Sequence, residues 1–317
     1  MKKTILALAV PALMAAGAVN AATVYDQDGV TVSIGGAAEV QLIQPYEFGD
    51  EDNKLDVRLD DGELNFGVDV KVSDSLTALG FFDFENEDDE GGVVNDELWA
   101  GFKGDFGKFT VGRQYTFWDD SGIGEDIELG LEGFDSNEPA DGEDVLKYRY
   151  EGETVWFGIA HDLDTGDDVS HTDAGVGASF AGVDLALYAN DADLSATTDV
   201  FAIQVSAVYN VDAFTVGASY TDIDEEINGD TNKAGTGSIV ELLAGYGMGD
   251  WQYYIGYNFA EMDNDWEGNN VYANATYKMH SNVKTYIEVG YADQDPEPTT
   301  GKSDDSTGFL VGMEVKF

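Results

Sequence analysis

Carboxylates are the side chains of this sequence that could most readily carry chemistry. The chain has 63 Asp and Glu residues against 15 Lys and Arg, which gives a formal net charge of −48. Acids recur in runs such as Asp50-Glu51-Asp52 and Glu87-Asp88-Asp89-Glu90. These runs could bind Ca²⁺ or Mg²⁺, but they lack the ligand spacing of an EF-hand loop. We therefore expect solvated acidic surfaces, no dedicated metal site and no cofactor.

Catalytic patterns are absent from the sequence. The three histidines are His161, His171 and His280, and they form neither a Ser-His-Asp order nor a His-Glu-x-x-His pattern. The chain has no cysteine, so a disulfide scaffold or a thiolate zinc site is impossible. The strong negative charge opposes binding to nucleic acid. The sequence thus predicts a protein that is not an enzyme and has no nucleic-acid partner.

The longest acidic stretch runs from Phe117 to Asp144. Its carboxylates between residues 119 and 138 are Asp119, Asp120, Glu125, Asp126, Glu128, Glu132, Asp135 and Glu138. Two explanations of such acidity remain open and can coexist. One is adaptation of the surface to high salt, and the other is a functional field that attracts cations. The elements that hold these acids decide what the field could act on.

Those elements have a period of two. From Val30 one face reads Val30, Val32, Ile34, Gly36, Ala38, Val40 and Leu42, and the other face is small or polar. The same alternation recurs at 64–72, 201–209, 251–259, 271–279, 283–291 and 309–317. It is typical of strands with one apolar side. After the first twenty residues, no run approaches the ~20 apolar residues of a transmembrane helix.

The connections alternate in length. Seven short turns, near residues 74, 106, 152, 182, 212, 249 and 281, alternate with eight longer acidic stretches, 45–53, 86–94, 117–144, 162–172, 190–197, 222–236, 260–268 and 293–306. These fifteen connections separate sixteen strands. The number is even, with short turns at one end and long loops at the other, as in outer-membrane barrels. A sheet can span lipid only when it is closed, and a ring of this size leaves a water channel.

We therefore predict an all-β fold, a 16-stranded antiparallel transmembrane β-barrel with short periplasmic turns and long extracellular loops. The competing fold is a soluble protein of two packed sheets. Aromatic residues near strand ends, such as Trp251, Tyr291 and Phe317, favour the membrane barrel because they suit interfacial girdles. The small, polar opposite faces could not supply the other half of a soluble core.

The first residues have the pattern of an export signal. Lys2 and Lys3 precede an apolar stretch over 4–19, and Val19-Asn20-Ala21 supplies small residues for cleavage. We expect cleavage after Ala21, with one residue later as the alternative. This leaves residues 22–317 as a single barrel domain.

Several segments together resemble the general diffusion porins of the Gram-negative outer membrane. These are the opening Ala22-Thr23-Val24-Tyr25-Asp26-Gln27-Asp28-Gly29, then Gly112-Arg113-Gln114-Tyr115 followed by Asp120 and Asp126, then Lys284-Thr285-Tyr286, and finally Thr307 to Phe317. The resemblance covers nearly the whole chain after the signal. It is strongest at the two ends and in the third loop.

The resemblance implies a homotrimer of barrels in the outer membrane, each with its own channel for passive diffusion of small hydrophilic solutes and ions. Outer-membrane lipid and lipopolysaccharide would surround the trimer. The terminal Phe317 is similar to the signal that the outer-membrane assembly machinery reads. In the family the third loop folds inward and narrows the channel. Here the matching loop is 117–144.

The resemblance also suggests constriction residues. Asp126 matches a constriction acid of the family, whereas the second family acid falls at Gly130, so Glu128 or Glu132 would replace it. We include Asp119, Asp120 and Glu125 of the same loop. Glu63 and Glu97 stand where the family has arginines on the barrel wall, and Arg58 is a candidate wall cation.

Three further cations complete the predicted site. Lys147 and Arg149 alternate with apolar Leu146, Tyr148 and Tyr150, so they should point into the channel. Arg113 lines the wall or anchors the third loop. With two wall cations replaced by acids, the constriction should prefer cations. The alternative is a sugar-type, substrate-specific channel, for which Tyr188, Tyr272 and Tyr286 are inward candidates.

Overall fold

The computed structural model describes residues 21–48, 54–86, 92–130, 139–163, 169–232, 235–295 and 304–317. The predicted signal peptide, apart from Ala21, and the predicted constriction residue Glu132 lie outside the described residues. In the described part, no helix is long and apolar enough to cross a membrane.

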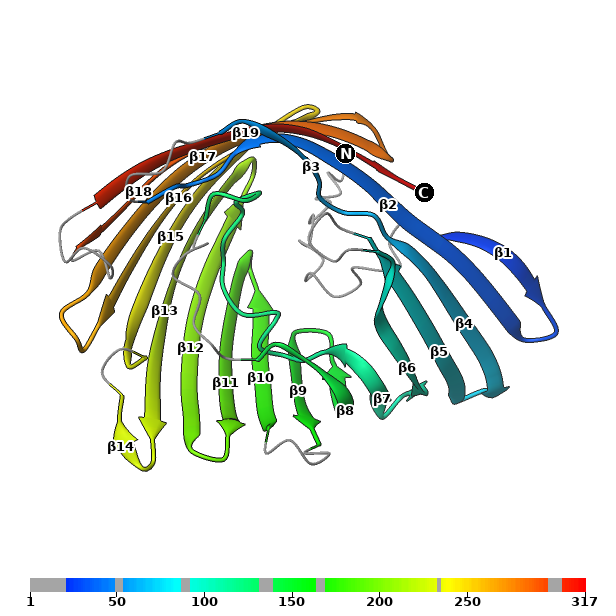
Figure 1. The fold of residues 1–317 in the computed structure, drawn as a ribbon. Coiled ribbons are helices and arrows are strands. Elements are labelled where there is room, and N and C mark those ends of the chain that lie inside the picture. Colours follow the sequence, from blue (N-terminus) through cyan, green and yellow to red (C-terminus); the bar gives the residue numbers. More distant parts are fainter. Residues whose placement is uncertain are drawn as a thin grey trace.

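The strands form one closed antiparallel sheet (Figure 1). Sixteen strands make up the ring: β2 (Val30–Gln44), β4 (Leu64–Ser73), β5 (Leu76–Glu85), β6 (Val94–Gly104), β7 (Gly107–Tyr115), β8 (Asp141–Glu151), β9 (Val155–Asp162), β10 (Ser170–Phe180), β11 (Val183–Ser195), β12 (Thr198–Val211), β13 (Phe214–Ile227), β15 (Gly237–Met248), β16 (Trp251–Met262), β17 (Glu267–His280), β18 (Val283–Asp295) and β19 (Asp304–Lys316). The ring closes because β2 pairs with β4 on one edge and with β19 on the other. The predicted fold is confirmed.

The seam of the barrel is built from both ends of the chain. The short strand β1 (Ala22–Gln27) pairs with the first half of β2, and β19 pairs with the second half. Phe317 exchanges backbone hydrogen bonds with Gly36, at 3.2 and 3.0 Å. On the other edge of β2, β3 (Asp56–Leu59) and β4 follow each other as one interrupted strand. The short β14 (Asp230–Thr231) pairs with the end of β13.

Burial in this barrel is the reverse of that in a soluble protein. On β12, Val205 is 53% exposed on the outer face, while Gln204 and Ser206 beside it are buried on the inner face. On β16, Ile255 is 52% exposed and Asn258 is buried. Outer apolar and inner polar faces are what a barrel in lipid requires. The period of two in the sequence therefore positions polar groups inside the ring.

The seven predicted short turns all connect adjacent strands, but several predicted loops are wrong in extent, because strand residues lie at their ends. Residues 222–227, for example, continue β13. Residues 190–195 continue β11, so only residues 196 and 197 join it to β12. Likewise β16 and β17 are joined by residues 263–266 alone. These strand ends carry acids that hide the alternation, as at Asp191 and Asp193. Beyond the hydrocarbon band a strand needs no apolar face, so the pattern fades while the backbone pairing continues.

Candidate functional site

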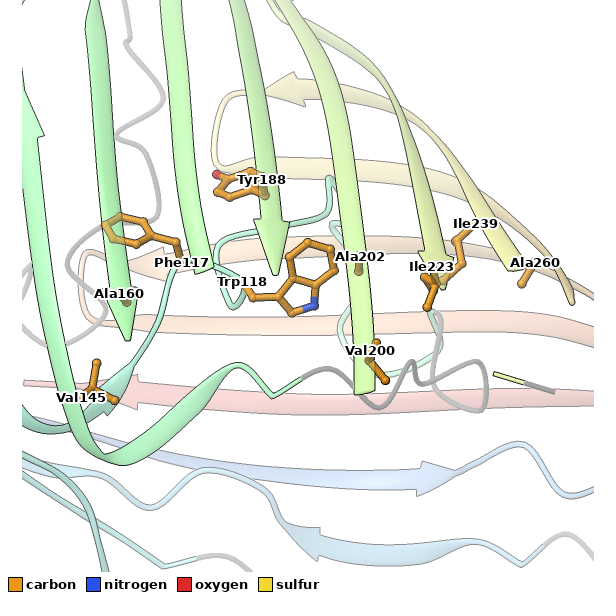
Figure 2. Packing of buried hydrophobic residues seen from close by; sticks show 10 residues of the cluster. All are labelled: Phe117, Trp118, Val145, Ala160, Tyr188, Val200, Ala202, Ile223, Ile239 and Ala260. Atoms are coloured by element: carbon orange, nitrogen blue, oxygen red, sulfur yellow. The ribbon is translucent and has the colours of Figure 1, made fainter. Parts of the chain in front are cut away.

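Loop three is the connection between β7 and β8, residues 116–140. Its described residues fold into the barrel instead of away from it, as predicted. Phe117 and Leu129 are fully buried, although both belong to a loop. Figure 2 shows Phe117 and Trp118 beside Tyr188 and Ala202, which belong to β11 and β12 of the wall. Loop three therefore narrows the space inside the ring.

Carboxylates of the wall hold the backbone of loop three. Asp173 on β10 accepts the N–H groups of Phe117 and Trp118, each at 3.0 Å. Glu288 on β18 accepts three successive N–H groups, those of residues 127, 128 and 129, each at 2.8 Å. A loop inside a barrel has no ladder to satisfy its amides, so charged acceptors on the wall replace the ladder.

Between Asp173 and Glu288, neutral polar side chains of the wall also form hydrogen bonds with the backbone of loop three. The N–H of Gly122 donates to the side chain of Gln204 at 2.7 Å, and the N–H of Glu125 donates to the Tyr272 hydroxyl at 2.9 Å. Asn274 donates to the carbonyl of Glu125 at 2.6 Å. Loop three thus follows the inner wall from β10 to β18.

Apolar contacts fix both ends of the described loop. Phe117 and Trp118 belong to a buried cluster with Val145, Ala160 and Val200. Leu129 belongs to a second cluster, whose other buried members are Ile43, Tyr272, Tyr286 and Leu310. Glycine makes room for Leu129, because a Cβ at Gly308 would lie 2.7 Å from its side chain. These contacts exclude water from the loop's attachment to the wall.

The predicted loop acids lie along this attached segment. Burial raises the pKa of Asp119 and of Asp120 to about 6, against the opposing effect of Lys147. Burial also raises the pKa of Glu125 to about 6, with a further contribution from Asp126. The pKa of Asp126 is likewise raised to about 6 by burial, opposed by a backbone hydrogen bond. Four loop carboxylates therefore change charge in the same pH range.

Glu128 is attached directly to the wall of the barrel. Its carboxylate pairs with Arg58 of β3 and accepts a 2.8 Å hydrogen bond from Gln41 of β2. Arg58 also pairs with Asp60 at 2.6 Å. The predicted wall cation Arg58 is therefore placed at the far end of loop three, where it joins the loop to the seam.

A cavity of about 420 Å³ lies between loop three and the wall formed by β2 to β8. Five predicted residues line it, namely Asp119, Asp120, Glu97, Lys147 and Arg149. Glu97 accepts a 2.8 Å hydrogen bond from the Trp99 indole. Glu63 lies between β3 and β4, on the same face as buried Asn65. Both wall acids are thus on the inner face.

The cations of this cavity hold the base of loop three. Lys147 donates to the carbonyls of residues 115 and 116, at 2.8 and 3.2 Å. Arg149 is buried, pairs with Glu151 at 2.8 Å and lies 3.6 Å from Asp120. Its guanidinium carbon is 4.5 Å from the ring of Trp156, a cation–π distance.

Arg113 differs from the other predicted wall residues. It lies directly opposite Leu98, which is 44% exposed on the outer face, so both side chains are on that face. Its guanidinium pairs with Glu143 at 2.6 Å and donates to the carbonyl of Asn95. Arg113 therefore does not line the inside of the barrel. A bulge in the pairing of β7 with β8 brings Glu143 to it.

Sequence reasoning missed the residues that attach the loop. Asp173, Gln204 and Glu288 all occupy inward positions of alternating strands, and this is the only signal the sequence offers for them. It also missed Lys103 and Lys108, which line the cavity of about 420 Å³. Lys103 pairs with Asp69 at 2.6 Å, and the Lys108 ammonium lies 4.3 Å from the Trp99 ring centre.

One group of acids has the spacing of a cation site. Carboxylate oxygens of Glu39, Asp61 and Glu314 lie within 4.8 Å of one another. Two lysines already oppose this charge, because Lys284 and Lys316 lie 2.9 and 3.0 Å from Glu314. The acids are therefore partly neutralised by the protein itself.

A closed ring of sixteen antiparallel strands, apolar outside and narrowed by an inward loop, defines a channel-type barrel of the outer membrane. The model of the Gram-negative porin family matches residues 7–297. The chain belongs to this family, and it is a multi-pass protein of the Gram-negative outer membrane.

Relatives and solved structures agree with this assignment. Porin-like protein H of Photobacterium profundum is 36% identical, and the alignment covers 100% of both chains. Outer membrane protein U of Vibrio parahaemolyticus is 27% identical, with 92% of this chain and 90% of the relative covered. A solved trimer form of OmpT from Vibrio cholerae is 19% identical with a TM-score of 0.74, covering 92% of this chain and all of the other.

Proposed function

We propose that this protein forms a water-filled channel for passive diffusion of small hydrophilic solutes and ions, with a preference for cations. The observation that carries the proposal is the position of loop three. Its acids Asp119 and Asp120 share one cavity with Glu97 of the facing wall. Permeating ions must pass this narrowed space, so its charge sets the preference.

The wall between β2 and β6 adds to the negative charge. Glu63 lies near the carboxylates of Asp61, Asp83 and Asp96 and near the ammonium group of Lys316. Four basic residues line the cavity, and two of them, Lys103 and Arg149, each have an acidic partner. Around Glu63 the carboxylates therefore outnumber the ammonium group of Lys316, which supports the preference for cations.

Reversal potentials across planar bilayers test this proposal. Under a KCl gradient at about 0.1 M the sign should indicate K⁺ preference, and at about 1 M the preference should nearly vanish. The reason is that the Debye length falls from about 10 Å to about 3 Å over this range. A preference for chloride at low salt would refute the proposed selectivity, and absence of conductance would refute the channel.

A sugar-type channel is the alternative, and it would need an accessible track of aromatic side chains. Tyr188, Tyr272 and Tyr286 are all buried, at 6%, 2% and 3% exposure. They pack under loop three, which counts against their use as a track. Saturable block of the ionic current by maltose or maltotriose would revive the alternative.

Processing and assembly are also part of the proposal. We expect a signal peptide over residues 1–21, a homotrimer in lipid and lipopolysaccharide, and recognition of Phe317 by the assembly machinery. We further expect neither enzymatic activity nor a cofactor. Mass spectrometry of the purified outer-membrane protein tests the cleavage site. Deletion of Phe317 should lower the folded amount in the outer membrane without changing its conductance per trimer.

A further inference from the structure

A second cavity lies inside the barrel at the end with the short turns, apart from loop three. Its volume is about 460 Å³. It is lined by lysines and neutral donors, Lys278, Lys284, Lys316, His280, Gln252 and Thr276, and by two acids, Asp250 and Glu314. Three ammonium groups against two carboxylates is an exceptional balance in a chain with a net charge of −48.

The pairing of the strands places two of these lysines face to face. Lys278 on β17 is directly opposite Lys284 on β18. Like charges in directly opposed positions of antiparallel strands destabilise the pair. An anion between the two ammonium groups would remove this cost.

The nearby carboxylates leave donors unused. Glu314 lies 2.9 Å from Lys284 and 3.0 Å from Lys316, and Glu39 lies 3.8 Å from Lys284. An ammonium group has three N–H donors. Lys278 is exposed and has no ion pair within the residues that the structure describes. The ammonium group of Lys278 therefore faces the cavity without an acidic partner among the described residues.

From this arrangement we infer a binding site for small oxyanions of the phosphate type, held by Lys278, Lys284 and Lys316 at the short-turn mouth. The inference rests on the proposed channel function for its route of access. The acids of loop three and the facing wall would repel anions from the loop end. The short-turn mouth would thus be the favoured entrance for the anion, and a bound anion would slow the passage of solutes.

The test uses inorganic phosphate and the full mature protein in detergent. Line broadening of the ³¹P signal measures binding and requires no conduction. Lys278→Gln should weaken phosphate binding about tenfold or more, because it removes one charge-assisted contact. Lys71→Gln is the matched control, since Lys71 lies near another short turn, pairs with Asp74 and does not line the cavity.

Equal phosphate binding by Lys278→Gln and the unaltered protein would overturn the inference. Tighter binding of hexaglutamate than of phosphate would also overturn it, in favour of an acidic peptide partner. Because Lys278 is exposed, Lys278→Gln should fold, and heat-modifiable migration on a gel checks this. A protein that binds phosphate but conducts no ions would refute the channel while leaving the site intact. A protein that conducts ions with a preference for cations but binds no phosphate would refute the phosphate site and leave the channel function intact.

Discussion

The two sides of the barrel's inner wall carry charge in different ways. From β10 to β18, single acids such as Asp173 and Glu288 are buried, and each accepts several backbone N–H groups of loop three. From β2 to β8, acids and bases line an open cavity. The same alternation of residues produces both sides. The two sides differ in whether loop three covers the acids. The side from β10 to β18 holds the loop in place, and the side from β2 to β8 sets the charge of the narrowed space.

The largest effect should come from removing the main attachment of the loop. Glu288→Ala deprives three N–H groups and Asn274 of their acceptor. Each buried group left unsatisfied costs about 1–3 kcal/mol, so loop three should leave the wall. We expect a larger and noisier single-channel conductance in planar bilayers.

The control for this change is Glu225→Gln, which alters a buried wall acid that bonds to Asn232 near β14. Its conductance should stay unchanged. A Glu288→Ala channel of normal conductance would show that the apolar contacts of Leu129 and Phe117 alone hold the loop.

The ion selectivity of the channel should depend on the charges of the inner wall from β2 to β8. Glu63→Gln combined with Glu97→Gln removes two inner charges. A unit charge about 8 Å away is worth about 0.5 kcal/mol in water, or about twofold in local cation concentration. Each removed charge also raises the local Cl⁻ concentration about twofold, so we expect the K⁺/Cl⁻ permeability ratio at low salt to fall by up to about sixteenfold, as measured by reversal potential.

Glu143→Gln is the matched control, because Glu143 pairs with Arg113 on the outer face. It removes the same charge from the same barrel without touching the inner wall. An equal fall in the permeability ratio would mean that total charge, and not the inner wall, sets selectivity.

The sequence predicts the direction of side chains on the inner wall, but it does not predict which of them contact loop three. The period of two predicted the ring of strands and the inward direction of Lys147 and Arg149, because side-chain direction alternates with each residue. The wall position of Glu97 followed from the family resemblance. The period of two could not separate Glu288, which binds the loop, from Glu97, which faces the cavity. That distinction depends on the path of loop three, a contact between segments about 160 residues apart. Arg113 was misplaced because a local match cannot fix which face a residue occupies.

A smaller effect is expected from pH. The pKa of Asp119, Asp120, Glu125 and Asp126 is raised to about 6 by burial, so these groups are mainly neutral at pH 5 and mainly charged at pH 7. Cation preference should therefore rise as the pH increases from about 5 to about 7. Reversal potentials at fixed salt measure this. Asp119→Asn with Asp120→Asn should flatten the rise, and an unchanged profile would place the titrating groups elsewhere.

The same shift has a consequence for stability. Because the folded-state pKa of these acids is above the unfolded value, the folded state binds more protons around pH 5 to 6. Their contribution to stability is present below the unfolded pKa and is lost as the pH rises through about 6. The attachment of loop three should thus be weaker at pH 7 than at pH 5, which proteolysis of the loop can report.

The smallest effect on permeation is expected from a substitution of Arg113. This substitution tests whether a charge on the outer face influences the channel. Arg113→Gln removes a positive charge close in sequence to the constriction, but its side chain pairs with Glu143 on the outer face. The K⁺/Cl⁻ permeability ratio should change much less than in Lys147→Gln, whose ammonium contacts the base of loop three inside the barrel. A half-exposed ion pair contributes at most about 1 kcal/mol, so the variant should also fold. A shift of the ratio by Arg113→Gln as strong as that by Lys147→Gln would mean that the side chain of Arg113 faces the channel and not the outer face.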